Sequence, residues 1–193
     1  MIIKNHPNKI KFCVLISIDI VLMLLDGLLT YINTPDLALE GNFLVARFGL
    51  GWGALFTANA ITLAIVVYTL YYALFKYETL IVDAANAKEY LSWLFYNRPD
   101  KFIWSFYKFP KNWKPVLAVF GHALIYSAIV SRAILVCEWA FNLPAAYWSF
   151  RRSLFLNRVD VWVVVIVALF VIIYWFISEY KKSEKAKRQN SLR

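Results

Sequence analysis

Residues 159–177 read VDVWVVVIVALFVIIYWFI, a run in which Asp160 is the single charged side chain. A helix of roughly 20 predominantly apolar residues is long enough to cross the hydrocarbon core of a bilayer. A core helix of a soluble protein rarely stays apolar on every face over such a length. The run therefore predicts a transmembrane helix.

Three further apolar runs precede it, at residues 12–32, 43–75 and 115–140. The first contains Asp19 and Asp26, but it is long enough to span a bilayer and no small-residue cleavage site follows it, so it is predicted to be a retained helix. We therefore predict an all-α membrane protein, with four transmembrane helices in a single domain at residues 1–180. Residues 181–193 are predicted to form a mobile, basic cytoplasmic tail.

Composition supports the same class. Of 193 residues, 61% are hydrophobic and 17% are charged, against about 45–50% and about 25% in ordinary soluble domains. Sixteen Lys and Arg residues lie in the N-terminus, the connection at residues 76–114 and the tail, and four lie in the other two connections. The positive-inside rule then predicts that both termini are cytoplasmic, in a prokaryotic inner membrane.

The central connection combines apolar, aromatic and basic residues. Tyr77, Leu80, Ile81, Ala84, Tyr90, Leu91 and Leu94 recur at roughly helical spacing, which predicts a cytoplasmic amphipathic segment near the membrane surface. The stretch FIWSFYKFP at residues 102–110 follows it. Aromatic residues among lysines can stack on nucleic-acid bases, but beside transmembrane helices they form interfacial belts. We expect no nucleic-acid partner; the lipid bilayer, including anionic lipids at this basic aromatic loop, is the expected partner.

Polar side chains within the predicted helices indicate where function resides, because charges at membrane depth are costly and usually functional. Asp19 and His122 each lie about eight residues from a cytoplasmic helix end, which predicts an inner polar pair. Asp26 and Arg132 both fall in the outer half, where pairing would lower the cost of both charges. The predicted outer cluster comprises Asp26, Thr30, Glu40, Asn42, Arg132 and Glu138.

Two kinds of chemistry fit the outer cluster. Asp26, Glu40, Asn42 and Glu138 offer oxygen ligands suited to a divalent cation such as Ca²⁺ or Mg²⁺. Zinc is less well supported, because His122 is the only histidine in a predicted span. No hydrolase, metalloprotease or phosphate-loop motif occurs, so the motifs give no support to catalysis and the catalytic residues are unknown. The same charges can also be structural pairs that fix helix register.

The pattern of Asp26 and Thr30, followed by Glu40 and Asn42 at the start of the next span, resembles a family of small uncharacterised prokaryotic membrane proteins. Their first hairpin has the pattern D-x-x-x-T, then E-x-N-P. The match covers about 35 residues, and Phe43 stands where the family usually has proline. The resemblance implies a polytopic membrane protein in which these four residues form a unit, and it implies no activity.

Three functions remain open from the sequence. The first is the binding or transport of a small solute or cation through an intramembrane polar cavity, in a homo-oligomer because four helices rarely enclose a pore alone. The second is a small membrane-embedded enzyme acting on a lipid or lipid-linked substrate. The third is a structural or regulatory membrane subunit whose polar contacts serve assembly.

Overall fold

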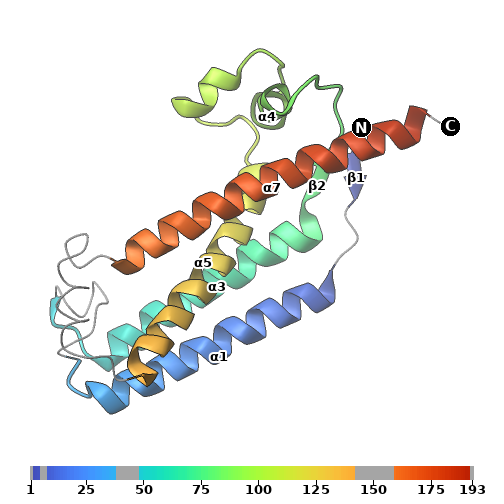
Figure 1. The fold of residues 1–193 in the computed structure, drawn as a ribbon. Coiled ribbons are helices and arrows are strands. Elements are labelled where there is room, and N and C mark those ends of the chain that lie inside the picture. The colour runs from blue at the N-terminus through green and yellow to red at the C-terminus, as the bar shows by residue number, and fades with distance from the viewer. Residues whose placement is uncertain (1, 5–7, 38–47, 142–158, 192–193) are drawn as a thin grey trace. The chain divides into compact units, whose positions relative to one another are not determined.

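The computed structural model describes residues 2–4, 8–37, 48–141 and 159–191. Four helices in these ranges are long and apolar enough to cross a membrane, which confirms the predicted helical class (Figure 1). They are α1 (Lys9–Asn33), α3 (Trp52–Tyr71), α5 (Lys114–Ala140) and α7 (Val159–Ser191). A π-helical segment, Tyr72–Lys76, extends α3. The shorter elements are α4 (Ala87–Tyr96), a 3-10 helix (Phe102–Phe106) and the strands β1 (Ile2–Lys4) and β2 (Glu78–Leu80).

The chain divides into two compact units. Unit 1 comprises residues 1–12, 69–123 and 169–193, and unit 2 comprises residues 13–68 and 124–168. Each of the four long helices contributes residues to both units. Helix α5 gives its first ten residues, Lys114–Ala123, to unit 1, whereas α1 gives only its first four, Lys9–Phe12.

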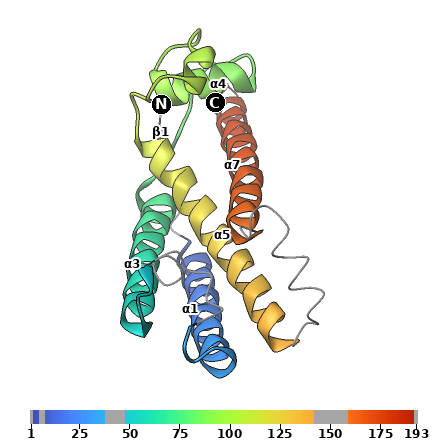
Figure 2. The same ribbon diagram turned by 90° about the vertical axis from the view of Figure 1, so that its left-hand side faces the viewer.

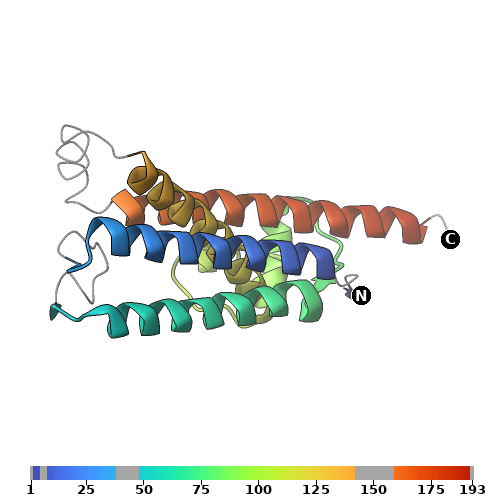
Figure 3. The same ribbon diagram turned by 90° about the horizontal axis from the view of Figure 1, so that it is seen from below.

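Helices α1 and α3 form an antiparallel hairpin (Figure 3). Helix α1 ends at Asn33, one residue beyond the predicted apolar run, and a turn at Pro35 and Asp36 follows. Beyond that turn, the ring of Trp52 at the start of α3 contacts the ring of Tyr31 near the end of α1, with centroids 5.6 Å apart. The Trp52 indole nitrogen donates a hydrogen bond of 2.9 Å to the carbonyl oxygen of Pro35. The turn is therefore fastened to the first residue of α3.

Unit 1 contains the largest apolar core of the described chain. Its buried members come from the π-helical segment and the residue that follows it, from α4, from the first turns of α5 and from the second half of α7: Ala73, Tyr77, Tyr90, Leu94, Ala118, Val119 and Trp175. Figure 2 shows α4 beside the start of α5, and the rings of Tyr90 and Phe95 on α4 contact the rings of Tyr180 and Phe176 on α7. Strand β1 pairs antiparallel with β2, with Ile3 opposite Thr79, and so ties the N-terminal residues to this unit.

The amphipathic helix predicted over residues 77–94 is correct only in its second half. Tyr77 adopts an extended conformation and β2 follows it, so residues 77–84 are not helical. Helix α4 begins after Asn86, whose side-chain oxygen accepts a 3.0 Å hydrogen bond from the Glu89 amide. Such an N-cap satisfies a helix-end donor. The spacing of the apolar residues could not reveal that β1 pairs with residues 78–80, which therefore form a strand and not a helix.

The prediction of a mobile tail from residue 181 is wrong for the residues that the structure describes. Helix α7 continues without a break to Ser191. Its buried side chains Trp175, Glu179, Ser183 and Ala186 follow one another at spacings of three or four residues, which places them on one helical face. The tail is therefore an ordered amphipathic helix, and its lysines occupy the face away from unit 1's core.

Candidate polar site between helices α1, α3 and α5

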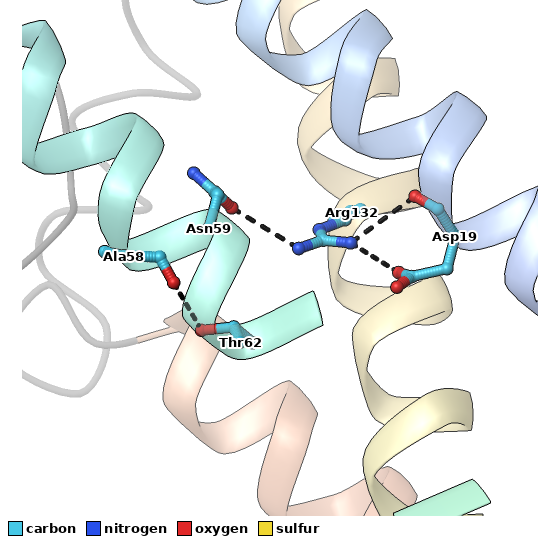
Figure 4. A network of polar contacts seen from close by, with 5 residues as sticks. All are labelled: Asp19, Ala58, Asn59, Thr62 and Arg132. Carbon is cyan, nitrogen blue, oxygen red and sulfur yellow. Dashed lines mark hydrogen bonds and ion pairs between the residues drawn. The ribbon is translucent and has the colours of Figure 1, made fainter. Parts of the chain in front are cut away.

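A buried ion pair joins α1 to α5 within unit 2. Arg132 Nη1 lies 2.5 Å from Asp19 Oδ1, and it also donates to the Asp19 backbone oxygen at 3.4 Å (Figure 4). The Asp19 residue is 0% exposed and Arg132 is 8% exposed. A buried pair in this geometry neutralises both charges, and removing either partner would leave the other charge uncompensated.

Helix α3 completes the network through an amide. Arg132 Nη2 donates to Asn59 Oδ1 at 3.3 Å, and Asn59 Nδ2 donates to the Leu55 carbonyl oxygen at 3.1 Å. Because its nitrogen binds the carbonyl one turn earlier, the Asn59 side chain presents its oxygen to the guanidinium. One turn later, Thr62 Oγ1 donates to the Ala58 carbonyl oxygen at 2.8 Å and so satisfies its own hydroxyl. Three helices thus meet at one guanidinium.

One acceptor in this network has no partner. Asp19 Oδ2 is buried and forms no hydrogen bond with any described residue. An unsatisfied buried oxygen is unfavourable unless a water molecule, a proton or a bound group compensates it. Asp19 Oδ2 can therefore accept a hydrogen bond from one more donor. The charges of Asp19 and Arg132 cancel at this site.

The predicted pairings are wrong. Arg132 was expected to pair with Asp26, and Asp19 with His122; the structure instead pairs Arg132 with Asp19. His122 lies in unit 1, where its Nδ1 donates a 3.0 Å hydrogen bond to the Ala118 carbonyl oxygen of the preceding turn. The prediction counted depth from each helix end, but Arg132 lies 18 residues after the start of α5 and meets Asp19, which lies 10 residues after the start of α1.

The other members of the predicted outer cluster are distributed as follows. Thr30 is buried on α1 and Asp26 on the same helix is partly exposed, while Glu138 is buried on α5. Asp26 and Glu138 lie seven and six residues beyond Asp19 and Arg132 along their helices. Glu40 and Asn42 lie outside the described residues. The four-residue unit of the first hairpin therefore stays a prediction.

A metal centre also stays a prediction. Among the residues that the structure describes, no three His, Cys, Asp or Glu side chains are placed to hold a metal ion. The predicted ligand set of Asp26, Glu40, Asn42 and Glu138 includes two residues beyond that description. At the observed network, Arg132 places a positive charge beside Asp19, which opposes a second cation there.

Sequence reasoning missed another buried carboxylate, Glu179 on α7 in unit 1. Thr79 Oγ1 of β2 donates to Glu179 Oε2 at 2.9 Å, and Lys182 Nζ lies 2.6 Å from Oε1. Burial raises the pKa of the Tyr77 phenol above its usual range, and the neighbouring Glu179 carboxylate raises it further. These contacts attach β2 to α7. In the sequence, the recurrence of Trp175, Glu179 and Ser183 at four-residue spacing was the signal that these side chains share one face of a helix.

In comparisons with known protein families, curated proteins and solved structures, none matches this chain. The resemblance of the first hairpin to small prokaryotic membrane proteins thus stays an expectation from the sequence.

Proposed function

We propose that this chain is a non-catalytic integral membrane subunit, with four spans and both termini on the cytoplasmic side of a prokaryotic inner membrane. Large apolar side chains, among them Leu24 and Leu28 on α1 and Ile166 and Phe170 on α7, lie exposed on the long helices. Lipid tails or neighbouring membrane helices cover surfaces of this kind. The distribution of Lys and Arg supports the orientation.

The burial of the Asp19–Arg132 pair is the observation that carries this proposal. Both charges are neutralised within the chain, and Asn59 ties a third helix to them. A polar contact shared by three helices favours one helix register over alternatives, which is the best-attested role of buried polar groups. The role we assign to the network is to hold α1, α3 and α5 in a fixed arrangement, so that the subunit presents a defined surface for assembly.

A second candidate function is the binding or passage of a small solute or cation, and the unpartnered Asp19 Oδ2 favours it. Since Arg132 opposes a metal cation at this position, a proton or a neutral hydrogen-bond donor is the compatible ligand. A divalent cation would instead require the outer cluster with Glu40 and Asn42. A path through the bilayer would also require a homo-oligomer.

Catalysis on a lipid or lipid-linked substrate has the least support among the described residues. A nucleophile needs a neighbouring base, but Ser127 Oγ donates to the Val164 carbonyl oxygen at 3.2 Å and His122 binds the Ala118 carbonyl oxygen. Both side chains are thus engaged with the backbone of the helices around them.

A double-mutant cycle in detergent-purified protein tests the structural role. Asp19→Asn should destabilise the fold by about 3–5 kcal/mol, because Arg132 keeps its charge without a counter-charge. Adding Arg132→Gln should recover much of that loss. The matched control is Asp83→Asn, which breaks the exposed Asp83–Lys187 ion pair and should change stability little. Additive losses from the two network substitutions would contradict the coupling.

A flux assay separates the subunit role from the second candidate function. Wild-type protein is reconstituted in liposomes loaded with dyes that report protons, Na⁺, K⁺ or Ca²⁺. The subunit role predicts the leak rate of protein-free liposomes for all four ions. An ion flux through the wild type that is absent from both Asp19→Asn and the folded double variant would overturn the subunit role. The second candidate function, ion passage, would then be favoured.

A further inference from the structure

Residues 97–114, which run from the end of α4 to the first residue of α5, are called the basic aromatic loop. It carries five basic residues and one acid, Asp100, which pairs with Lys101 at 3.0 Å. Its sequence continues directly into α5, one of the four helices long and apolar enough to cross a membrane. The loop therefore joins a membrane-spanning candidate to a net positive charge.

Hydrogen bonds between the backbone of the loop and the end of α4 hold the loop in place. The Tyr96 hydroxyl donates to the Lys108 carbonyl oxygen at 2.8 Å, and the amides of Lys111 and Asn112 donate to the Phe95 carbonyl oxygen at 3.0 and 3.1 Å. The Trp104 ring packs edge-on against Tyr96, with centroids 5.8 Å apart. These contacts with α4 fix the conformation of the loop. The exposed side chains of the loop are therefore held on a defined backbone.

Those exposed side chains are large and apolar. Phe109 is 87% exposed, Ile103 69%, Tyr107 64% and Trp113 57%. The ammonium groups of Lys101 and Lys108 lie 4.5 and 4.2 Å from the centre of the Trp104 ring. Aromatic and aliphatic side chains beside lysines match the boundary between acyl chains and headgroups, where the rings enter the apolar layer and the ammonium groups reach the phosphates.

We infer that the basic aromatic loop binds the headgroups of anionic lipids, with Phe109 and Trp113 inserted at the membrane interface. Charge complementarity identifies the occupant: the loop is basic, and the cytoplasmic leaflet, which the orientation proposed above assigns to this side, carries the anionic lipids. Each basic residue near such a surface contributes about a fivefold gain in affinity. The inference depends on that orientation for the leaflet but not on the Asp19–Arg132 network.

The test compares two matched charge removals in the full-length protein. The loop variant carries Lys111→Gln and Lys114→Gln; the control carries Lys181→Gln and Lys185→Gln on α7. All four lysines are exposed, and each variant loses two positive charges. Native mass spectrometry measures the affinity of the detergent-purified protein for phosphatidylglycerol and for phosphatidylcholine. Thermal unfolding without lipid checks that both variants are folded.

Wild type and control should prefer phosphatidylglycerol, whereas the loop variant should bind it about 25-fold more weakly, from two charges at about fivefold each. Phe109→Ala should weaken binding of both lipids, because the variant lacks the ring that enters the apolar layer. The variant should still fold, since the Phe109 side chain is exposed and contributes little to the core. Equal losses in the loop variant and the control would overturn the inference, because binding would then follow total charge. Displacement of the lipid by a single-stranded oligonucleotide of higher affinity would also overturn it and make the loop a nucleic-acid surface.

Discussion

Gly121 marks a close approach between α5 and α3, and its substitution by alanine tests how tightly these helices pack. A Cβ atom added at Gly121 would lie 2.3 Å from the Thr69 carbonyl oxygen, 2.6 Å from its carbonyl carbon and 3.0 Å from the Leu70 nitrogen. A carbon and a carbonyl oxygen in van der Waals contact lie about 3.3–3.6 Å apart. The two helix backbones must therefore separate by about 1 Å to admit a methyl group.

The expected loss follows from two opposing effects. Overpacking costs about 1–3 kcal/mol, and the upper end applies because the obstacle is backbone, which cannot rotate away as a side chain can. Alanine gains up to about 1 kcal/mol over glycine in helix propensity. Gly121→Ala should therefore lower the free energy of unfolding by about 2 kcal/mol.

Gly27→Ala in α1 is the matched control. A Cβ at Gly27 meets nothing within 4 Å, so only the propensity gain applies and the variant should be as stable as wild type or slightly more stable. Unfolding of both variants is followed by circular dichroism during titration with sodium dodecyl sulfate. If Gly121→Ala unfolds at the wild-type midpoint, or if Gly27→Ala loses as much stability, the close-contact explanation is incorrect.

Three further predictions follow from the orientation and from the Glu179 contacts. In a cysteine-free background, cysteine at Asp36 should react with an impermeant thiol reagent from outside, whereas cysteine at Gln189 should not; the reverse pattern would invert the proposed topology. Thr79→Val should lower stability by about 1–3 kcal/mol, because the buried Glu179 carboxylate loses a hydroxyl donor; equal melting curves would show that the hydroxyl is dispensable. The raised pKa of the Tyr77 phenol in the folded state means that its contribution to stability is intact below the unfolded pKa of about 10 and is lost as the pH rises above it. Tyr77→Phe should flatten this alkaline loss in unfolding measured against pH, and an unchanged slope would assign it to other groups.

The bounds of α1 and α5 could be predicted closely because apolar runs of this length have few alternatives, whereas α3 begins at Trp52, nine residues after the predicted start of the second helix. The expected start of the third helix at Pro115 and its end at Ala140 differ from α5 by a single residue. The end of the fourth helix was missed by fourteen residues, since Ile177 was the last residue of its apolar run. The helix continues through charged residues because one of its faces packs within unit 1, to which this part of α7 belongs. Only the spacing of Trp175, Glu179 and Ser183 indicated that face.

The site was predicted in part. Sequence reasoning placed Asp19 and Arg132 among the functional polar residues but chose the wrong partner for each. The error came from treating all helices as starting at one level, whereas the first turns of α5 pack with α4 in unit 1. Helix offsets of this kind arise from tertiary packing and leave no local signal in the chain. Asn59 was visible as a polar residue in an apolar run, but its orientation toward Arg132 depends on the fold.

The uninterrupted course of α7 has a mechanical consequence. Its 33 residues correspond to about 50 Å of helix at 1.5 Å per residue, and the hydrocarbon core of a bilayer is about 30 Å thick. In the proposed four-span arrangement, about 20 Å of this helix extends beyond the hydrocarbon core, and its buried face, which includes Glu179, Ser183 and Ala186, packs within unit 1. Each residue turns such a helix by about 100°. A reporter domain joined to it by a helical linker would therefore change its facing direction, and not only its distance from the membrane, with every residue added.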